Sequence, residues 1–210
     1  MKYPVYYLEL DESGNPKYGI EDIALVDTPA YEELFVAFSK EETFKFAIQN
    51  EEKRIITGAV MIPDKLVYRE QNNHPFYVVA TRETINDAAI KFASENKNNR
   101  IKLTHDTDSN VSDVFIFESF VTDENRVKEV VNFESLPMGT WFITCKIENE
   151  TVWNQIKAGQ FKGFSIEAFF KMNPAAMLTD NEIEAIKNSL SWYNTIIKFN
   201  VHIKKTTWII

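Results

Sequence analysis

The apolar residues of this chain come in short runs, and turn-forming residues separate one run from the next. Most runs are rich in β-branched and aromatic residues, which pack well on the pleated surface of a sheet. Such runs occur at 54–63 (RIITGAVMIP), 76–81 (FYVVAT), 111–123 (VSDVFIFESFVTD), 139–147 (GTWFITCKI) and 163–171 (GFSIEAFFK). This pattern predicts a chain that folds mainly as β-sheet, since few of the runs are long enough to form a helix.

Three segments show helical spacing or capping instead. Thr81 is a candidate N-cap for a helix over 82–96, and a shorter helix is expected near 150–158, before Gly159. The clearest helix is predicted over 178–200, where Thr179 and Glu182 have the spacing of a capping box. Residues 5–29 add two β-rich runs around a turn. We therefore expect one α+β domain with mainly antiparallel strands, since no repeat or flexible linker divides the chain.

Composition excludes several classes of protein. The chain has 210 residues, a hydrophobic fraction of 44% and a formal net charge of −8, which argues against a broad nucleic-acid or anionic-membrane surface. The single cysteine, Cys145, cannot form an intrachain disulfide and fits a reducing compartment. The sequence shows neither a secretory signal nor a run of about 18 apolar residues. We expect a soluble intracellular globular protein that binds no membrane and no nucleic acid directly.

A serine and a histidine are the main candidates for chemistry. Ser165 follows Gly163 in an apolar run, but its surroundings match neither Gly-x-Ser-x-Gly nor Ser-x-x-Lys, and strand serines are more often surface hydroxyls. His105 ends the apolar-alternating stretch IKLTH, and strand ends are where rigid scaffolds present reactive groups. His74 lies in a polar stretch and His202 in the C-terminal tail, so both are predicted to be surface or structural residues.

An oxygen-rich turn offers a metal site as an alternative. His105, Asp106 and Asp108 fall within THDTDSN, which could hold a cation. The turn lacks the glycine and the distal glutamate of an EF-hand loop, so a solvated acidic turn is the simpler interpretation. We expect no metal and no cofactor.

The segment 139–170 resembles the C-terminal signature of phage prohead maturation proteases of the XkdF-like serine protease family. The resemblance rests on Gly139-Thr140-Trp141, on Trp153 in the following helix, and on a block that runs Gly163, Phe164, Ser165, Ile166, Glu167. Upstream, RIITGAVMIPDKLVYR, LTHD and VFIFESF are similar to further strands of that family. The resemblance covers about residues 18–170.

The resemblance implies catalytic roles for Ser165, His105 and an acidic residue. Ser165 would be the nucleophile and His105 the general base. The favoured third member is Glu118, which lies in the apolar run VFIFESF and is expected to be a buried acid in need of a partner, with Asp22 as the alternative and Glu167 as a weaker candidate.

The family is related to herpesvirus assemblin-like proteases, so the resemblance implies a single-domain antiparallel β-barrel surrounded by helices. In prohead proteases of the HK97 type, a block similar to 22–30 follows the catalytic serine, whereas here it comes first. We therefore expect a circularly permuted barrel, which requires the 20–28 strand to lie beside the Ser165 strand. The protease domain is predicted to span 1–173, and 174–210 to form a helix and tail packed on it.

The implied function is that of a serine endopeptidase of virion assembly. It would cleave the scaffolding protein, segments of the major capsid protein and itself during head maturation. This cleavage would take place inside the assembling prohead in the host cytoplasm, where copies of the protein would also associate with one another. Two alternatives stay open: an inactive protease-fold protein that takes part in capsid or scaffold assembly, and a metal-dependent hydrolase that uses 104–108.

Overall fold

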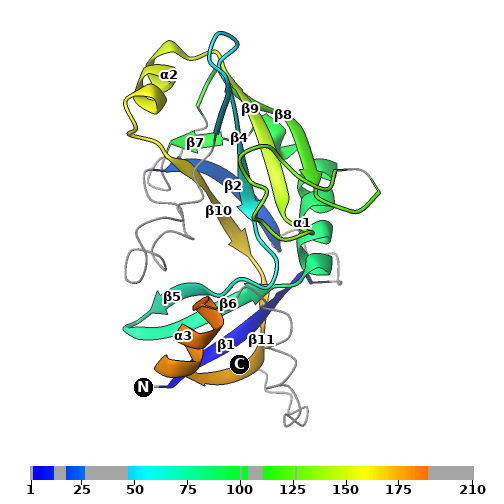
Figure 1. Ribbon diagram of the computed structural model, residues 1–210, viewed down its shortest axis with the longest axis vertical. Helices are drawn as coiled ribbons and strands as arrows, with labels where there is room; N and C mark the ends of the chain where they lie inside the picture. The colour runs from blue at the N-terminus through cyan, green and yellow to red at the C-terminus, as the bar shows by residue number, and fades with distance from the viewer. Residues whose placement is uncertain are drawn as a thin grey trace.

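Three β-sheets and three α-helices make up the computed structural model, which describes residues 2–11, 18–26, 47–99, 101–103, 111–125 and 127–188 (Figure 1). The strands are β1 (Lys2–Glu9), β2 (Gly19–Val26), β3 (Ala47–Asn50), β4 (Ile55–Met61), β5 (Val67–Gln71), β6 (His74–Ala80), β7 (Ile101–Leu103), β8 (Val114–Val121), β9 (Trp141–Ile147), β10 (Gly163–Phe169) and β11 (Lys171–Thr179). The helices are α1 (Arg82–Ser94), α2 (Glu150–Lys157) and α3 (Asp180–Asn188), with a short 3₁₀ helix, η1 (Lys97–Asn99).

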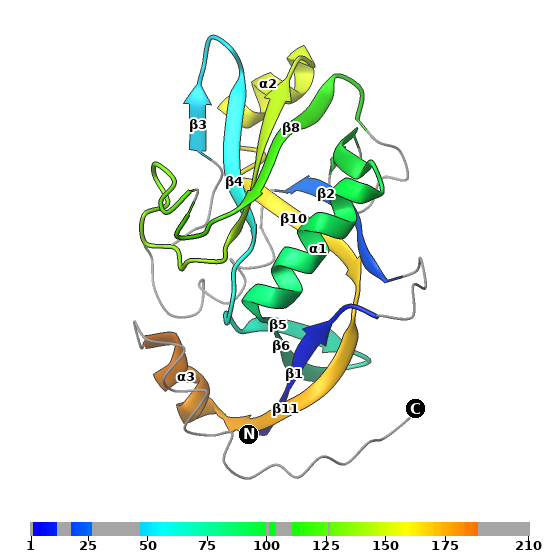
Figure 2. The same ribbon diagram turned by 90° about the vertical axis from the view of Figure 1, so that its right-hand side faces the viewer.

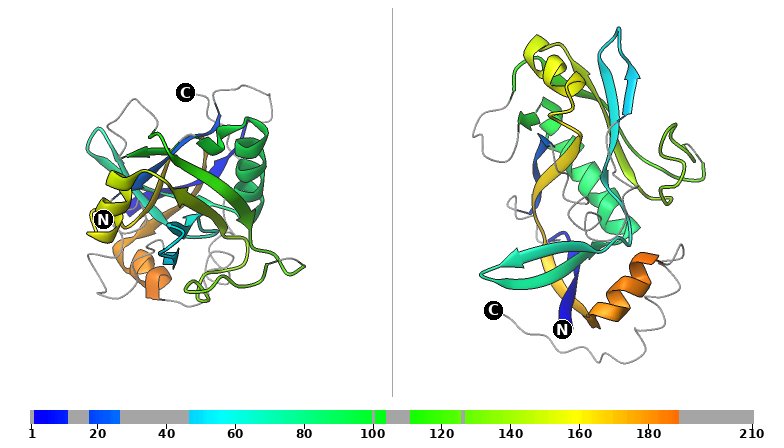
Figure 3. Two further views of the ribbon diagram at one scale, coloured as in Figure 1. Left: turned by 90° about the horizontal axis from the view of Figure 1, so that it is seen from above. Right: turned by 60° about the vertical axis from the view of Figure 1, so that its left-hand side comes forward.

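The sheets have the strand orders β11-β1-β6-β5, β10-β2-β7 and β3-β4-β9-β8. Only the β1–β6 and β2–β7 pairings are parallel among the described strands. β10 runs from the upper part of the molecule toward the lower sheet, where β11 continues the chain beside β1 (Figures 1 and 3). The α+β class with mainly antiparallel strands is therefore confirmed. The described strands form three separate sheets, however, and do not close into a single barrel.

The helix ends follow the sequence signals closely. The Thr81 hydroxyl accepts a hydrogen bond from the Thr84 N–H at 3.1 Å and caps α1 as predicted. At α3 the capping box is confirmed, since Glu182 accepts from the Thr179 N–H at 2.8 Å while the Thr179 hydroxyl lies 3.4 Å from the Glu182 nitrogen. Gly159 follows α2 with a φ of +73°, which is the left-handed conformation expected after a helix. The rest of the helix predicted over 178–200 lies outside the described residues.

Two asparagines close the hairpin between β5 and β6. Asn72 and Asn73 have φ values of +51° and +61°, the combination found in a two-residue type I′ turn, which suits the twist of paired strands. The signal for this turn in the sequence is the pair Asn-Asn, within the polar stretch before Pro75. His74 is the first residue of β6, and its exposure agrees with the surface position predicted for it.

The main core joins the two upper sheets to α1. Its largest members include Trp141 and Phe92, whose rings meet edge to face with centroids 5.6 Å apart. Figure 2 shows α1 running alongside this layer, and the helix contacts β2, β8 and β9. A second cluster fills the lower part, where Val5 of β1 and Tyr77 of β6 pack with Ile183 and Ile186 of α3.

The Gly-Thr-Trp motif builds the start of β9. Gly139 has a φ of +90°, a conformation that other residues rarely adopt, and a Cβ at this position would lie 2.6 Å from the Arg82 side chain. Both the backbone conformation and this close contact disfavour any other residue. Thr122 accepts hydrogen bonds from the N–H groups of Gly139 and Thr140, both at 3.1 Å. The Trp141 indole donates to the Ser119 hydroxyl at 2.9 Å. This motif therefore fixes the start of β9 and anchors Trp141 in the core.

The two β-rich runs at the start of the chain form strands, but they do not pair with each other. β1 belongs to the lower sheet and β2 to the sheet that carries β10 and β7. The boundary predicted between residues 173 and 174 falls inside β11, which pairs with β1 along its whole length. Of the described helices, none is long and apolar enough to cross a membrane.

Replacement of a core residue on α1 tests this packing. Phe92 is fully buried, whereas Ile90 on the same helix is 60% exposed. Phe92→Ala should lower the free energy of unfolding by about 3–5 kcal/mol, because it leaves a cavity against Trp141. Ile90→Ala should change it by less than about 0.5 kcal/mol. Urea denaturation measures both, and equal effects would contradict the position of α1.

Candidate functional site

The strand that carries Ser165 pairs with a strand from the start of the chain. β10 and β2 are antiparallel, with Ser165 aligned to Ala24, and β2 and β7 are parallel, with Ala24 aligned to Lys102. The N–H of Lys162 extends this contact, since it donates to the Val26 carbonyl at 2.8 Å. The prediction that the 20–28 strand lies beside the Ser165 strand is therefore confirmed for residues 20–26.

The two faces of this small sheet differ in character. Ile23, Leu25, Ile101 and Phe164 alternate with the residues around Ser165 and belong to the main core. The register places Ser165, Glu167, Asp22 and Lys102 on the opposite face, because aligned residues of neighbouring strands point to the same side. Ser165 thus lies on the polar face of a strand whose other face is anchored in the core.

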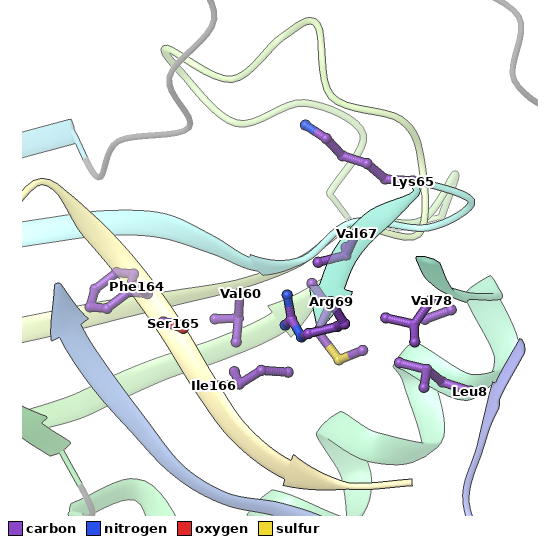
Figure 4. Close-up of a pocket in the computed structure, with 11 residues that line it drawn as sticks. Leu8, Val60, Lys65, Val67, Arg69, Val78, Phe164, Ser165 and Ile166 are labelled. Carbon is purple, nitrogen blue, oxygen red and sulfur yellow. The ribbon is translucent and has the colours of Figure 1, made fainter. Parts of the chain in front are cut away.

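Ser165 is only 7% exposed and lines a pocket with a volume of about 30 Å³, room for a group of a few atoms (Figure 4). The pocket lies where β10 passes β4 and one face of the lower sheet. Its described lining residues are Leu8, Val60, Met61, Lys65, Val67, Arg69, Val78, Ala80, Phe164, Ser165 and Ile166. Most of them are apolar, which keeps bulk water away from the serine hydroxyl.

A turn after β4 brings one cation to the pocket. Pro63 is buried, and Asp64 follows it with a φ of +58° while its N–H donates to the Ala80 carbonyl at 2.9 Å. Burial raises the pKa of the Asp64 carboxyl, and the charge of Arg82 offsets part of this effect. Lys65 comes next and is only 6% exposed. The turn therefore holds the Lys65 backbone at the rim of the pocket.

Arg69 of β5 supplies the second cation. In Figure 4 its side chain extends toward Val60, and the ammonium end of Lys65 lies apart from the other labelled side chains. The family resemblance includes the stretch that holds Lys65 and Arg69, but it implies a role for neither residue. The available signal was a pair of cations after Pro-Asp in an otherwise apolar strand region.

An ion-pair network ties the strands of the site together. Lys102 Nζ lies 2.7 Å from the Asp22 carboxylate and 3.6 Å from that of Glu167, so one cation links β7, β2 and β10. The pKa of Lys102 is raised, chiefly because Asp22 accepts a hydrogen bond from it, and burial opposes the shift only in part. The negative charge of Asp22, a candidate for the orienting acid, is thus balanced by the positive charge of Lys102.

The burial expected for Glu118 is wrong. Ile116 is buried and aligned with Cys145 in the main core, but a bulge at Phe117 shifts the register so that Glu118 is aligned with Thr144 on the other face of the sheet. A one-residue bulge reverses the alternation of the residues that follow it, and Glu118 is consequently exposed. Glu118 is therefore not a buried acid in need of a partner.

The two remaining histidines of interest, His105 and His202, lie outside the described residues, as does the whole of the oxygen-rich turn THDTDSN. The His74 ring nitrogen Nδ1 lies 2.8 Å from the Asn72 carbonyl, which ties this histidine to its own turn. In the part of the chain that the structure describes, no group of three His, Cys, Asp or Glu side chains is placed to hold a metal ion.

Comparison with protein families assigns the class of protein. The family described as "Putative phage serine protease XkdF" matches residues 43–173, which include β10, the turn after β4 and most of the pocket. The match covers more than half of the chain, and the protein therefore belongs to this family of phage serine proteases. No curated protein and no solved structure shows a significant match to the chain.

Removal of the Lys102 charge tests the network. Lys102→Met should lower stability at pH 7, because Asp22 and Glu167 lose their shared cation. Since the folded pKa of Lys102 is raised, its contribution is present below the unfolded lysine value of about 10.4 and is lost as the pH rises through the folded value.

The difference in denaturation midpoint between wild type and Lys102→Met should thus stay constant from about pH 6 to 9 and shrink above about pH 10.5. Lys157→Met, which removes an exposed lysine of α2, is the matched control and should show little difference at any pH. A Lys102→Met difference that is unchanged at high pH would contradict the ion-pair account.

Proposed function

We propose that the protein is a serine endopeptidase that cleaves scaffold and capsid-protein segments during phage head maturation. One observation carries the proposal: Ser165, inside the segment matched by the serine protease family, lies on the wall of a mostly apolar pocket. A serine hydroxyl there can meet a substrate carbonyl with little competition from bulk water. Gly139 and Trp141, the other residues of the motif, have a structural role instead, because they form the start of β9 and part of the core.

In the proposed mechanism, the Ser165 hydroxyl oxygen attacks the peptide carbonyl carbon. His105 accepts the hydroxyl proton and passes it to the leaving amine, after which water repeats the sequence on the acyl-enzyme. Chain connectivity supports this pairing, since β7 ends at Leu103, two residues before His105, and Leu103 is aligned through Leu25 with Phe164. Because β2 lies between β7 and β10, Leu103 and Phe164 are two strand spacings, about 10 Å, apart. Two residues span up to about 7 Å, and the side chains of the histidine and the serine can cover the rest.

Asp22 and Glu118 are the main candidates to orient His105, with Glu167 as the weaker third, and the two main candidates lie in different parts of the fold. Asp22 lies on the polar face that also carries Ser165, where Lys102 already pairs with it. Glu118 lies exposed on another sheet. An ion-paired carboxylate can still accept a hydrogen bond from an imidazole N–H, so position favours Asp22 over the Glu118 assignment that the sequence suggested.

The relation to assemblin-like proteases and the circular permutation belong to the same proposal. The antiparallel pairing of β2 with β10 meets the condition that the permutation sets. In this account, the strand that follows the serine in HK97-type enzymes is supplied here by the start of the chain. The major capsid protein and the scaffolding protein would be the partners, inside the assembling prohead in the host cytoplasm.

Replacement of the nucleophile tests the reaction type. Ser165→Ala should reduce cleavage of scaffolding protein by at least about a thousandfold, because no other group attacks the carbonyl. The fold should persist, since loss of one strand hydroxyl costs about 1 kcal/mol or less. Ser112→Ala, at an exposed turn, is the control and should retain full activity. Cleavage by Ser165→Ala at the wild-type rate would remove Ser165 from the mechanism and favour the metal-dependent hydrolase, whereas a wild-type protein that cleaves nothing would favour the inactive assembly protein.

Histidine variants test the base. His105→Ala should lose activity, whereas His74→Ala should retain most of it, because His74 is exposed and bonded to its own turn. His202→Ala is predicted to behave like His74→Ala. An imidazole accepts a proton only when neutral, so the cleavage rate should rise with pH through one transition at about pH 6–7. A rate that stays flat from about pH 5 to 8 would argue against a histidine base.

A further inference from the structure

The strand β2, which pairs with the strand of the proposed nucleophile, contains one residue too many for regular pairing. β10 and β2 are aligned at Glu167 and Asp22, but the next aligned pair is Ala168 and Ile20, so two residues of β2 oppose one residue of β10. The extra residue is Glu21, and the irregularity is a β-bulge. Bulges are over-represented beside active sites, where they change the direction of a side chain.

This bulge decides which side chains of β2 reach the face of Ser165. In a regular strand, Ile20, Asp22 and Ala24 would point to one side, because side chains alternate with a period of two. In the structure Ile20 is only 1% exposed and belongs to the main core, whereas Asp22 pairs with Lys102 on the opposite face. A β2 strand without the bulge would therefore either bury Asp22 or expose Ile20.

A buried lysine contacts both residues at the bulge. Lys97 of η1 is 6% exposed, and its Nζ atom donates to the Ile20 carbonyl at 2.8 Å and lies 3.6 Å from the Glu21 carboxylate. The Glu95 carboxylate lies 2.8 Å from the same atom and balances its charge, as a buried ammonium group requires. A bulge disrupts the regular backbone ladder, and here Lys97 supplies a hydrogen-bond donor to the Ile20 carbonyl.

The segment that carries Lys97 also leads to the proposed base. η1 directly precedes β7, which runs parallel to β2 and ends just before His105. α1 packs against the same strand (Figure 2), where a Cβ on Gly19 would lie 2.9 Å from the Lys91 side chain, and Lys91 pairs with Glu95. Lys97 therefore ties the segment before the proposed base to the strand of the candidate acid.

We propose that Lys97 is a positioning residue of the Ser165 site. By holding the bulge, it turns the Asp22 carboxylate toward the face of β2 and β10 on which Ser165 lies, where that carboxylate orients His105. Lys97 acts through Asp22 and takes no part in the reaction itself. The effect on cleavage rests on the proposed peptidase function and on Asp22 as the orienting acid, whereas the clamp on the bulge stands on its geometry alone.

The clamp is tested first without activity. In the full chain carrying Ser165→Ala, nuclear Overhauser contacts between aligned residues report the register of β2 against β10. Lys97→Met should remove the contact between Ile20 and Ala168, the aligned pair that follows the bulge. Lys146→Met is the matched control, because Lys146 also donates to a backbone carbonyl but lies on β9, and it should leave this contact in place.

A double-mutant cycle then tests the link to Asp22. Lys97→Met should lower kcat for cleavage of scaffolding protein at least about tenfold with little change in KM, because the acid is displaced while the peptide still binds. Asp22→Asn should have an effect of similar size, and adding Lys97→Met to it should lower kcat by less than about a further twofold. Ile183→Ala, a change in the second core cluster, should lower the denaturation midpoint and leave kcat unchanged.

A second variant covers the case in which loss of the buried lysine prevents folding. Lys97→Gln replaces Lys97→Met in both experiments if circular dichroism shows that the methionine variant is unfolded. The glutamine amide is uncharged and one atom shorter than the lysine side chain, so the same changes are expected from it.

The outcomes separate the two proposals. Retention of the contact between Ile20 and Ala168 without Lys97 overturns the clamp, whether or not peptides are cleaved. Loss of this contact with an unchanged kcat, or with losses of kcat that multiply in the cycle, overturns the action through Asp22 and leaves the peptidase proposal intact. Loss of the contact in a protein whose wild type cleaves no scaffolding protein supports the clamp and contradicts the peptidase proposal.

Discussion

The antiparallel pairing of β10 with β2 is the contact on which the rest of the site depends. It aligns Ser165 with Ala24, and through Ala24 with Lys102 of β7, while Ile23, Leu25 and Phe164 hold the opposite face in the core. A slip of one residue would exchange these faces and bury Lys102 and Asp22 among apolar side chains. The ion pair between these two residues therefore favours the register that presents the serine.

A second constraint comes from the turn between β4 and β5. Asp64, with its positive φ and its bond to the Ala80 carbonyl, fixes where β5 begins. From there β5 carries Val67 and Arg69 past β10 on the far side of the pocket. The pocket is thus shared between elements that are distant in the sequence, and the family match covers all of them except β1.

Local signals in the sequence predicted much of the fold. Thr81, the Thr179–Glu182 pair and Gly159 marked helix ends through bonds to nearby backbone groups, and the structure confirms each of them. The partner of the Ser165 strand was predicted only through resemblance to a family with another chain order, because strand pairing is a long-range property that periodicity does not encode.

The predictions that were wrong concern features that likewise depend on how distant parts of the chain associate. The bulge at Phe117 has no local sequence signature, and it turned Glu118 from an expected buried acid into an exposed one. The division into three sheets depends on how whole strands associate, so a barrel inferred from a resemblance could not be checked from the residues. Arg69 and Lys65 were overlooked because their proximity to Ser165 arises only when β5 and β10 meet around the pocket.

We propose that Ser165 is an activated nucleophile, and covalent labelling tests this proposal most directly. The native full-length protein is treated with a fluorophosphonate, which reacts with activated serines, and the modified site is mapped by mass spectrometry. The account predicts one adduct per chain, on Ser165, that disappears when the protein is unfolded in urea before treatment or when His105 is replaced by alanine. Labelling of a different serine, or no reaction at Ser165 under conditions that fully modify a known serine protease, would contradict it.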